Sequence, residues 1–485
     1  MEQTYVTYEQ FGAVGDGITD DMPAIVACHD YANAHSLTVV GRDDANYYIG
    51  GHDLTATVRT AVRWGQAHFT VDDRVLENID SVCFRVVPDV DPISITLPPL
   101  RRGQKRVDFP HKGNLYIRVS DSSRMIYIRK GLNQNNGTPT TDSFIVDIEG
   151  NIIGDINWDY DSYTDIYAIA ADDTPITIEG GVFTTIANQQ ESFYNYHSRN
   201  IYITRSHVTV CNLTHLVTGE GDHGAPYDGF LSVAHAWDVT LQDCLLTPHK
   251  TYMTPSKIPG QMVSMGSYDL SLFSTIETCF LRLRQTIDIT DDRYWGLMGS
   301  NFSKKFCMED CVISRYDAHM GVTDCTIRRC ELGHMGVNLI GFGQALIEDT
   351  VFRCGRTINL RSDYGSFFHG ELIMKNCTWI PTRFGTRRPL EIISARNEGD
   401  HDFGYLCAMP ERIAIENLTI DDTHIDDPGL TYAVFPDYDS EYNDNKPYPY
   451  GTPRNVVLSG IRSRSGREIV LCRRAEEYPH LEGMS

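Results

Sequence analysis

Residues 306–311, Phe-Cys-Met-Glu-Asp-Cys, carry the pattern that decides the fold: apolar, any, apolar, any, a polar turn residue, then a small or apolar residue. The same pattern returns at residues 325–330, Cys-Thr-Ile-Arg-Arg-Cys. Because side chains alternate between the two faces of a strand, this spacing predicts a short strand with one buried face that ends at a tight turn.

The pattern occurs ten times between residue 176 and residue 461, and the positions two and four residues before each turn are always apolar. The turn position is held by Gly180, Asn212, Asp243, Ser274, Asp310, Arg329, Asp349, Asn376, Asn417 and Gly460. Successive turns are 19 to 43 residues apart. A constant strand with insertions of variable length predicts stacked coils, in which equivalent positions form columns.

The sequence therefore predicts an all-β fold, a single-stranded parallel β-helix with long loop insertions. A β-sandwich or a propeller is the alternative, but both need tight hairpins. Asn-Gly and Asp-Gly turns are sparse between these strands. We therefore favour the β-helix.

The N-terminal residues point to the same architecture. Residues 11–21, FGAVGDGITDD, form a glycine-rich turn that runs into an amphipathic helix expected over 22–35, with Thr19 or Asp20 as its cap. This stretch resembles the opening motif of the pectate-lyase-like superfamily. The resemblance implies a right-handed parallel β-helix with an N-terminal capping helix. It also implies a link to carbohydrates, since the superfamily includes polygalacturonase-like hydrolases, exo-glucanases and phage tailspikes.

Three regions are expected along the chain. Residues 1–60 form the N-terminal cap, residues 61–175 form elaborated first coils, and residues 176–485 form the regular coils. A stretch rich in Asp, Tyr and Pro near 421–450 is expected to be a long loop insertion.

Composition limits the classes of partner. The chain has 65 acidic and 42 basic residues and a formal charge of -23, which excludes nucleic acid as a partner on bulk electrostatics. No apolar run reaches the ~20 residues of a membrane span. The 13 cysteines are expected to be mainly buried thiols. Four of them share the slot after the turn: Cys244, Cys311, Cys330 and Cys377.

Residues 1–10 lack the features of a secretory signal. We expect a secreted, periplasmic or cell-surface protein whose signal peptide was removed, with the cytoplasm as the alternative. A homo-oligomer is left open.

Acidic, imidazole and aromatic side chains are densest between residues 288 and 337. The segments at 319–322 and 334–337 both read His-Met-Gly-Val, which predicts the same place on two successive coils. Polar groups crowded beside an apolar column belong on a wall that is open to water or substrate. The expected catalytic residues are Asp291, Asp292, Asp317 and His319, and the expected substrate contacts are Asp228, His249, Lys250, Tyr252, Arg293, Tyr294, Trp295, Arg315 and His334.

Hydrolysis of a glycosidic bond needs a carboxylic acid and a carboxylate, so the clustered Asp residues favour a glycoside hydrolase acting on a poly- or oligosaccharide. The residue types match those of the polygalacturonase-like relatives, although their full set of spaced motifs is missing here. A polysaccharide lyase is the first alternative, because its reaction needs a base and a cation that neutralises a uronate. A non-catalytic glycan-binding or tailspike-like protein is the second. No cofactor is expected, and a divalent cation stays open because no metal-binding motif specifies one.

Overall fold

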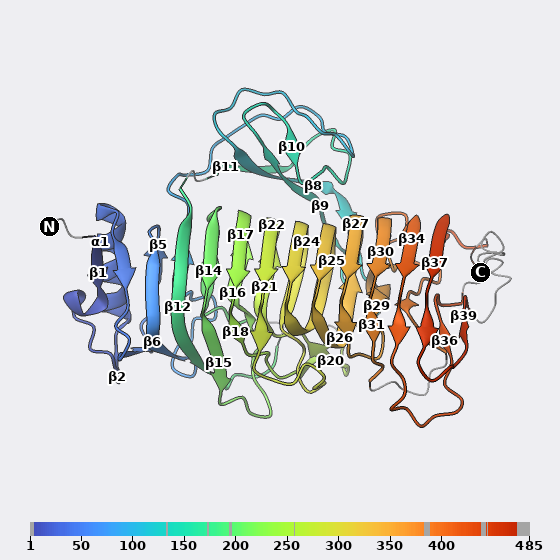
Figure 1. Cartoon of the computed structure of the whole chain (residues 1–485). Coiled ribbons are helices and arrows are strands. Elements are labelled where there is room, and N and C mark those ends of the chain that lie inside the picture. The colour runs from blue at the N-terminus through green and yellow to red at the C-terminus, as the bar shows by residue number, and fades with distance from the viewer. Residues whose placement is uncertain are drawn as a thin grey trace.

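The fold is an elongated parallel β-helix (Figure 1). The computed structural model describes residues 4–131, 134–171, 174–193, 196–256, 258–382, 389–437, 443 and 445–472. Within these residues the largest sheet joins 30 strands. The predicted all-β parallel β-helix with a capping helix is confirmed.

Each regular coil contributes strands to three faces, and some long strands bend through a corner and serve more than one. On the first face, parallel strands pair in the order β1 (Tyr5–Thr7), β3 (Thr38–Val40), β6 (Val62–Asp72), β12 (Ile176–Ile186), β14 (Val208–Cys211), β17 (Trp237–Gln242), β22 (Ile276–Leu281), β24 (Met298–Glu309), β25 (Val312–Arg328), β27 (Gly341–Glu348), β30 (Phe368–Lys375), β34 (Arg412–Glu416) and β37 (Asn455–Ser459).

The second face follows the first around a corner. Its strands, together with parts of the long strands named above, are β2 (Asp16–Asp20), β4 (Asn46–Ile49), β15 (Thr214–Thr218), β18 (Leu245–Leu246), β23 (Arg284–Gln285), β26 (Glu331–Leu339), β28 (Val351–Phe352), β31 (Thr378–Trp379), β35 (Thr419–Ile420) and β38 (Arg462–Ser463).

The third face carries most of the polar residues discussed below. Its strands, again together with parts of β24, β25 and β26, are β5 (Ala56–Val58), β7 (Phe84–Val86), β13 (Ile201–Ile203), β16 (Asp228–Ala234), β21 (Tyr268–Phe273), β29 (Ile358–Leu360) and β33 (Ile393–Ser394). A small parallel sheet joins β32 (Leu390–Glu391), β36 (Tyr432–Ala433) and β39 (Ile469–Val470).

A left-handed residue forms the corner between the first and second faces. Nine of the ten predicted turn residues occupy it, with φ between 50° and 80°. Most of them are Asn, Asp or Gly, which adopt this conformation at the lowest cost. The side chains also form a ladder, since Asn417 Nδ2 donates to Asn376 Oδ1 on the previous coil at 3.1 Å.

The tenth predicted turn, Ser274, is wrong for this column. Leu241 pairs with Phe280 and Phe280 pairs with Met308, so the corner residue of this coil is Arg282, with φ 55°. Ser274 directly follows β21, which ends at Phe273 on the third face. Residues 270–275 fit the pattern in full, whereas residues 278–283 have Thr278 at the first apolar position, so the pattern selects the wrong segment.

Helix α1 (Met22–His35) closes the N-terminal end of the coils and buries Ile25, Cys28 and His29, as its amphipathic pattern predicts. Its N-cap is Asp21 rather than Thr19 or Asp20. The carboxylate of Asp21 accepts from the backbone N–H groups of residues 14 and 15 at 2.7 and 3.1 Å and so fixes the glycine-rich turn. A short 3-10 helix, η1 (Tyr8–Phe11), precedes this turn.

An antiparallel sheet is inserted between β7 and β12 and lies outside the coils (Figure 1). Its order is β10 (Ile152–Ile153), β9 (Thr138–Val146), β8 (Leu115–Ile126) and β11 (Asp165–Ala170). The range 61–175 therefore contains coil strands up to Val86 and then this inserted sheet. A second insertion contains the hairpin of β19 (Tyr252–Pro255) and β20 (Met262–Met265). Part of the loop expected near 421–450, at 438–442 and 444, lies outside the described residues.

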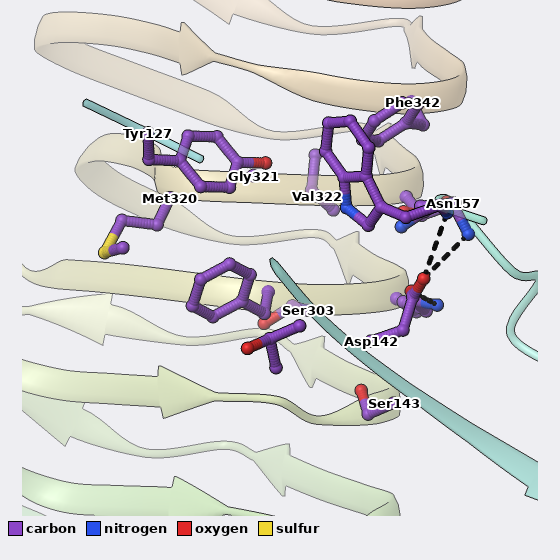
Figure 2. Close-up of a pocket in the computed structure, with 14 residues that line it drawn as sticks. Tyr127, Asp142, Ser143, Asn157, Ser303, Met320, Gly321, Val322 and Phe342 are labelled. Atoms are coloured by element: carbon purple, nitrogen blue, oxygen red, sulfur yellow. Dashed lines mark hydrogen bonds and ion pairs between the residues drawn. The ribbon is translucent and has the colours of Figure 1, made fainter. Parts of the chain in front are cut away.

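A buried ion pair fastens the inserted sheet to the coils. Lys304 Nζ on β24 lies 2.5 Å from Asp142 Oδ1 on β9, and both side chains are almost fully buried. Asp142 also accepts the backbone N–H of Asn157 at 2.9 Å, and the surrounding space is only a small cavity (Figure 2).

The interior of the coils is apolar. Tyr47, Phe69 and Phe183 occupy one column on successive coils, and Phe69 stacks on Phe183 at a centroid distance of 4.4 Å. The 13 cysteines are free thiols. The four cysteines of the shared slot are all buried, which agrees with their predicted packing role.

Candidate functional site

The predicted catalytic carboxylates separate into an accessible group and a buried one. Asp317 on β25 is 0% exposed, and its carboxylate forms ion pairs with Arg315 and Arg361. Although burial opposes ionisation, the two guanidinium groups hold the pKa of Asp317 below its usual range. As the structure stands, this carboxylate is a structural anion that does not face a substrate.

Asp317 belongs to an ion cluster, which we define as Arg129, Arg315, Asp317, Arg361 and Asp363; Arg315 and Asp317 are buried, and the other three are half-buried. Arg361 bridges the two carboxylates, with Nη1 at 3.0 Å from Asp317 and Nη2 at 2.8 Å from Asp363. Arg129 reaches Asp363 from the inserted segment. The cluster therefore joins two coils and the insertion, and two of its arginines, Arg129 and Arg361, come from positions that the sequence did not place near Asp317.

His319 is held by two neighbours. Its Nδ1 lies 2.9 Å from Asn301 Oδ1. Its Nε2 lies 3.1 Å from the hydroxyl of Tyr364, the last residue of the short 3-10 helix η2 (Ser362–Tyr364). Burial lowers the pKa of His319 to about 3. The ring is therefore neutral, with Nδ1–H donating to Asn301 and Nε2 accepting from Tyr364.

The two His-Met-Gly-Val segments do not occupy the same place, so that prediction is wrong. Val322 pairs with Gly341, whereas Val337 pairs with Tyr316. The chain turns a corner between the two segments, and this puts His319 and His334 on different parts of the coil.

Residues 291–295 form a loop before β24. Arg293 Nη2 lies 2.6 Å from Asp291 Oδ2, and its guanidinium lies 5.8 Å from the centroid of the Tyr294 ring. Arg315 donates to the backbone oxygen of Trp295 at 3.1 Å and lies over its ring. Arg315 is buried and contacts other parts of the protein, so this predicted substrate contact does not face a ligand.

Asp292 and His334, by contrast, line an open cavity of about 230 Å³, which we call the Asp292 pocket. Its lining comes from the loop before β24, from β26, from the segment that leads into β29 and from the residues after β31, and consists of Asp292, His334, Met335, Asn338, Gly355, Arg356, Asn359 and Thr382. Asp292 and Arg356 are exposed, and His334 is half-buried. The pocket thus combines a carboxylate, an imidazole, a guanidinium and two amides.

Strand register explains why the two asparagines meet. Asp317, Asn338, Asn359 and Ser394 are partners on successive coils of the third face. Asn359 Nδ2 donates to Asn338 Oδ1 at 2.7 Å. One polar column therefore runs from the ion cluster into the Asp292 pocket.

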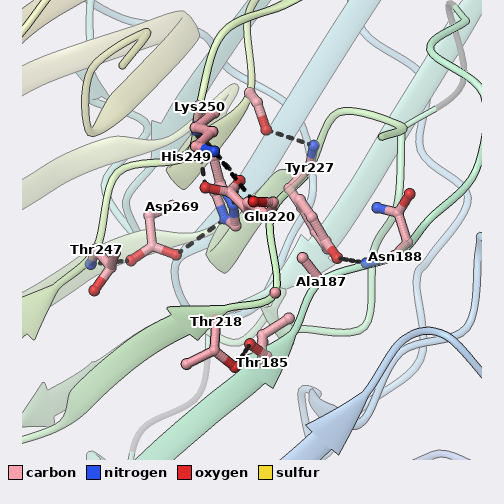
Figure 3. A network of polar contacts seen from close by, with 12 residues as sticks. Thr185, Ala187, Asn188, Thr218, Glu220, Tyr227, Thr247, His249, Lys250 and Asp269 are labelled. Carbon is pink, nitrogen blue, oxygen red and sulfur yellow. Dashed lines mark hydrogen bonds and ion pairs between the residues drawn. The ribbon is translucent and has the colours of Figure 1, made fainter. Parts of the chain in front are cut away.

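A second polar network is buried near β15 and β21 (Figure 3). His249 Nδ1 lies 3.0 Å from Glu220, and Asp269 accepts from His215 Nδ1 at 2.6 Å. Burial opposes protonation of His249, but the hydrogen bond to Glu220 raises its pKa overall. Because His249, Asp269 and His215 are buried, we interpret this network as structural.

The remaining predicted substrate contacts lie around this network. Lys250 Nζ donates to the backbone oxygen of Glu220 at 3.1 Å, and Tyr252 is buried. Asp228 is exposed on β16, although nearby protein atoms desolvate its carboxyl group enough to raise its pKa to about 6. None of these three residues lines the Asp292 pocket.

The sequence analysis missed Arg356, Asn338, Asn359 and Thr382. Residues 354–361, Cys-Gly-Arg-Thr-Ile-Asn-Leu-Arg, contain no carboxylate or histidine and so gave no signal of a cluster. The register of the third face, had it been known, would have placed Asn338 and Asn359 beside each other.

Within the described ranges, no three His, Cys, Asp or Glu side chains are grouped as metal ligands would be. No helix in that part of the chain is long and apolar enough to cross a membrane.

No family model matches the chain, and no curated protein matches it. Solved structures do. The tailspike protein gp49 from Pseudomonas phage LKA1 is 13% identical over 94% of this chain and 81% of that chain, with a TM-score of 0.45. The Pseudomonas phage phi297 tailspike gp61 is 10% identical over 95% and 81%, with a TM-score of 0.48. The surface protein and adhesin PfbA of Streptococcus pneumoniae is 12% identical over 96% and 100%, with a TM-score of 0.46.

All three structures match with TM-scores below 0.5, so the resemblance of residues 11–21 to the pectate-lyase-like superfamily stays an expectation. At identities of 10 to 13% the likeness concerns the fold alone. It assigns no reaction and no site residue to this chain.

Proposed function

We propose that this protein binds a poly- or oligosaccharide and cleaves its glycosidic bonds, with the Asp292 pocket as the site that holds a sugar unit. The observation that carries the proposal is the pocket itself. At ~30 Å³ per water molecule, its volume of about 230 Å³ replaces roughly eight waters, which is room for one sugar ring. Donors and acceptors from several coils surround that space, as hydroxyl recognition requires.

Hydrolysis, the reaction expected from the sequence, would use Asp292 and His334. The carboxylate of Asp292 would activate water, and the imidazole of His334 would protonate the leaving oxygen. Two carboxyl groups are the commoner arrangement. Among the described residues, Asp292 is the one carboxylate that lines the pocket. Asp317 cannot serve as the second carboxyl group, because Arg315 and Arg361 enclose it.

Arg356 favours a second candidate, β-elimination on a uronate. Its guanidinium can neutralise the sugar carboxylate and so make the neighbouring C–H more acidic. His334 would then act as the base. Its Nδ1 lies 3.4 Å from the backbone oxygen of Ile289, which fixes Nδ1 as the donor and Nε2 as the basic nitrogen.

A panel of polysaccharides tests the proposal with two assays. Hydrolysis releases reducing ends without new ultraviolet absorbance, elimination creates an unsaturated product that absorbs, and a pure binding protein retains glycan without either signal. We expect Asp292→Asn and His334→Gln to lower turnover by about 10²-fold or more, the range of an acid–base contribution. Lys305→Gln, at an exposed residue outside the pocket, is the matched control.

Arg356→Gln separates the reactions. It should abolish elimination but should only weaken binding if the reaction is hydrolysis of a neutral glycan. Full activity in all three pocket variants would reject the Asp292 pocket as the site. A polysaccharide substrate also fits the expected secreted, periplasmic or surface location, and a homo-oligomer remains to be tested by light scattering.

A further inference from the structure

A second cavity, of about 190 Å³, lies where the inserted sheet meets the coils. We call it the aromatic pocket. The inserted segment contributes two arginines, Trp158 and Asp159, and the coils contribute further aromatic rings. None of its lining residues belongs to the Asp292 pocket. Two parts of the chain that are far apart in sequence therefore build a site that the proposed reaction does not use.

Aromatic rings form one side of this pocket. Trp158 meets Phe342 edge to face at a centroid distance of 5.1 Å and Tyr405 at 6.0 Å. Phe367 lies 4.6 Å from Tyr405. Next to them, the side chain of Leu406 is 76% exposed. The rings hold one another in place, so the pocket offers a preformed apolar wall.

Two guanidinium groups form the other side. Arg124 lies 5.2 Å from the centroid of the Trp158 ring, and Arg102 lies 5.3 Å from that of Phe342. Within the described residues neither guanidinium has a carboxylate partner in ion-pair range. The carboxylate of Asp159 accepts instead from the backbone N–H of Arg102 at 2.8 Å.

Both guanidinium groups are exposed and so can reach a ligand. The chain as a whole carries a net charge of -23, and the arginines of the ion cluster are paired with acids. A strongly acidic protein repels anions at long range. Two neighbouring guanidinium groups without carboxylate partners therefore create a local exception that suits an anionic ligand.

We propose that the aromatic pocket binds a sugar unit that carries an anionic group. The apolar face of the sugar ring would pack on Tyr405 and Leu406, and the anionic group would lie between Arg102 and Arg124. The pocket has room for one such unit at roughly 30 Å³ per displaced water. It is a binding site separate from the Asp292 pocket and does not depend on which reaction occurs there.

Three small probes test the proposal in titrations followed by ligand-observed NMR. Glucuronate carries a carboxylate, glucose 6-phosphate carries a phosphate, and glucose carries neither. At least one of the two anionic probes should bind about tenfold more tightly than glucose. Hydrogen bonds to charged groups are stronger than neutral ones by about that factor in affinity. The two anionic probes show whether the site takes a carboxylate or a phosphate ester. Equal binding of glucose, or equal binding of inorganic phosphate alone, would overturn the proposal.

Variants locate the binding. Arg102→Gln/Arg124→Gln should weaken the anionic probe at least about tenfold, whereas Arg106→Gln, whose partner Asp108 lies outside the pocket, should not. Higher salt should also weaken binding of the anionic probe to the unmodified protein. Arg356→Gln should leave this binding unchanged. If Arg356→Gln loses binding of the anionic probe and the double variant does not, the anion binds in the Asp292 pocket. That outcome would refute this inference and leave the proposed function intact.

Discussion

Replacing Asp317 by Asn distinguishes a structural role from a catalytic one. The substitution keeps the shape of the side chain but removes the charge that lies between Arg315 and Arg361. Arg361 retains Asp363 as a partner, whereas Arg315 loses its ion pair and keeps its contacts with Trp295 and a longer-range attraction to Asp363. Leaving one member of a buried ion pair uncompensated costs about 3–5 kcal/mol.

The expected shift in melting temperature follows from the size of the chain. An unfolding entropy of about 2.1 cal/mol/K per residue gives roughly 1 kcal/mol/K for 485 residues. If the coils unfold together, Asp317→Asn should therefore lower Tm by about 3–5 °C. Asp291→Asn is the control, because its partner Arg293 is largely exposed and such surface pairs contribute about 0–1 kcal/mol.

Differential scanning calorimetry measures both variants, and a double-mutant cycle sharpens the result. Arg315→Met in the Asp317→Asn background removes the uncompensated guanidinium and should recover most of the lost Tm. An unchanged Tm in Asp317→Asn would refute the argument. So would a folded Asp317→Asn variant that loses glycan cleavage and stays inactive after the rescue, since that outcome identifies a catalytic carboxylate.

Three further predictions follow from named contacts. Lys304→Met leaves Asp142 buried without its partner, so it should speed hydrogen exchange in β8 and β9, while exchange in α1 stays unchanged. Asn417→Val should destabilise the protein by about 1–2 kcal/mol in denaturant melts because its φ is 57°, whereas Asn417→Gly should cost little. The pKa values of Asp317 and Asp363 are depressed in the folded protein. Their contribution to the free energy of unfolding is therefore present above the ordinary carboxyl pKa of about 3.9 and should be lost as pH falls through the folded values. A Tm that is independent of pH between 5 and 2 would contradict this.

The coil pattern could be predicted because each coil repeats the same local chemistry. A residue such as Asn376 or Asn417 is recognisable as a left-handed corner, and the apolar positions before it must face the interior. The pattern failed at Ser274 because two alternating segments follow each other, and only pairing with the neighbouring coils selects Arg282.

The site was harder to predict because proximity in the sequence is a poor guide to exposure in a β-helix. Asp292 and Asp317 belong to the same acidic stretch, yet one lines a pocket and the other is sealed by arginines. The sealing residue Arg361 is more than forty positions away, and Arg129 comes from the inserted segment. Such long-range partners depend on the coil register and on the insertion, and neither is encoded in a local motif.

The polar column of the third face shows how insertions decide where a β-helix can act. Its outward positions continue from Asp317 through Asn338 and Asn359, so three successive coils each place a polar side chain on the outer side of the strand. At Asp317 the segment after β29 and the inserted segment supply arginines that close the column. At Asn338 and Asn359 the cover ends, and the same column becomes the wall of a pocket. The length and charge of the surrounding loops therefore decide whether a polar coil position can reach a ligand. The polar side chain on the coil is necessary for binding but is not sufficient.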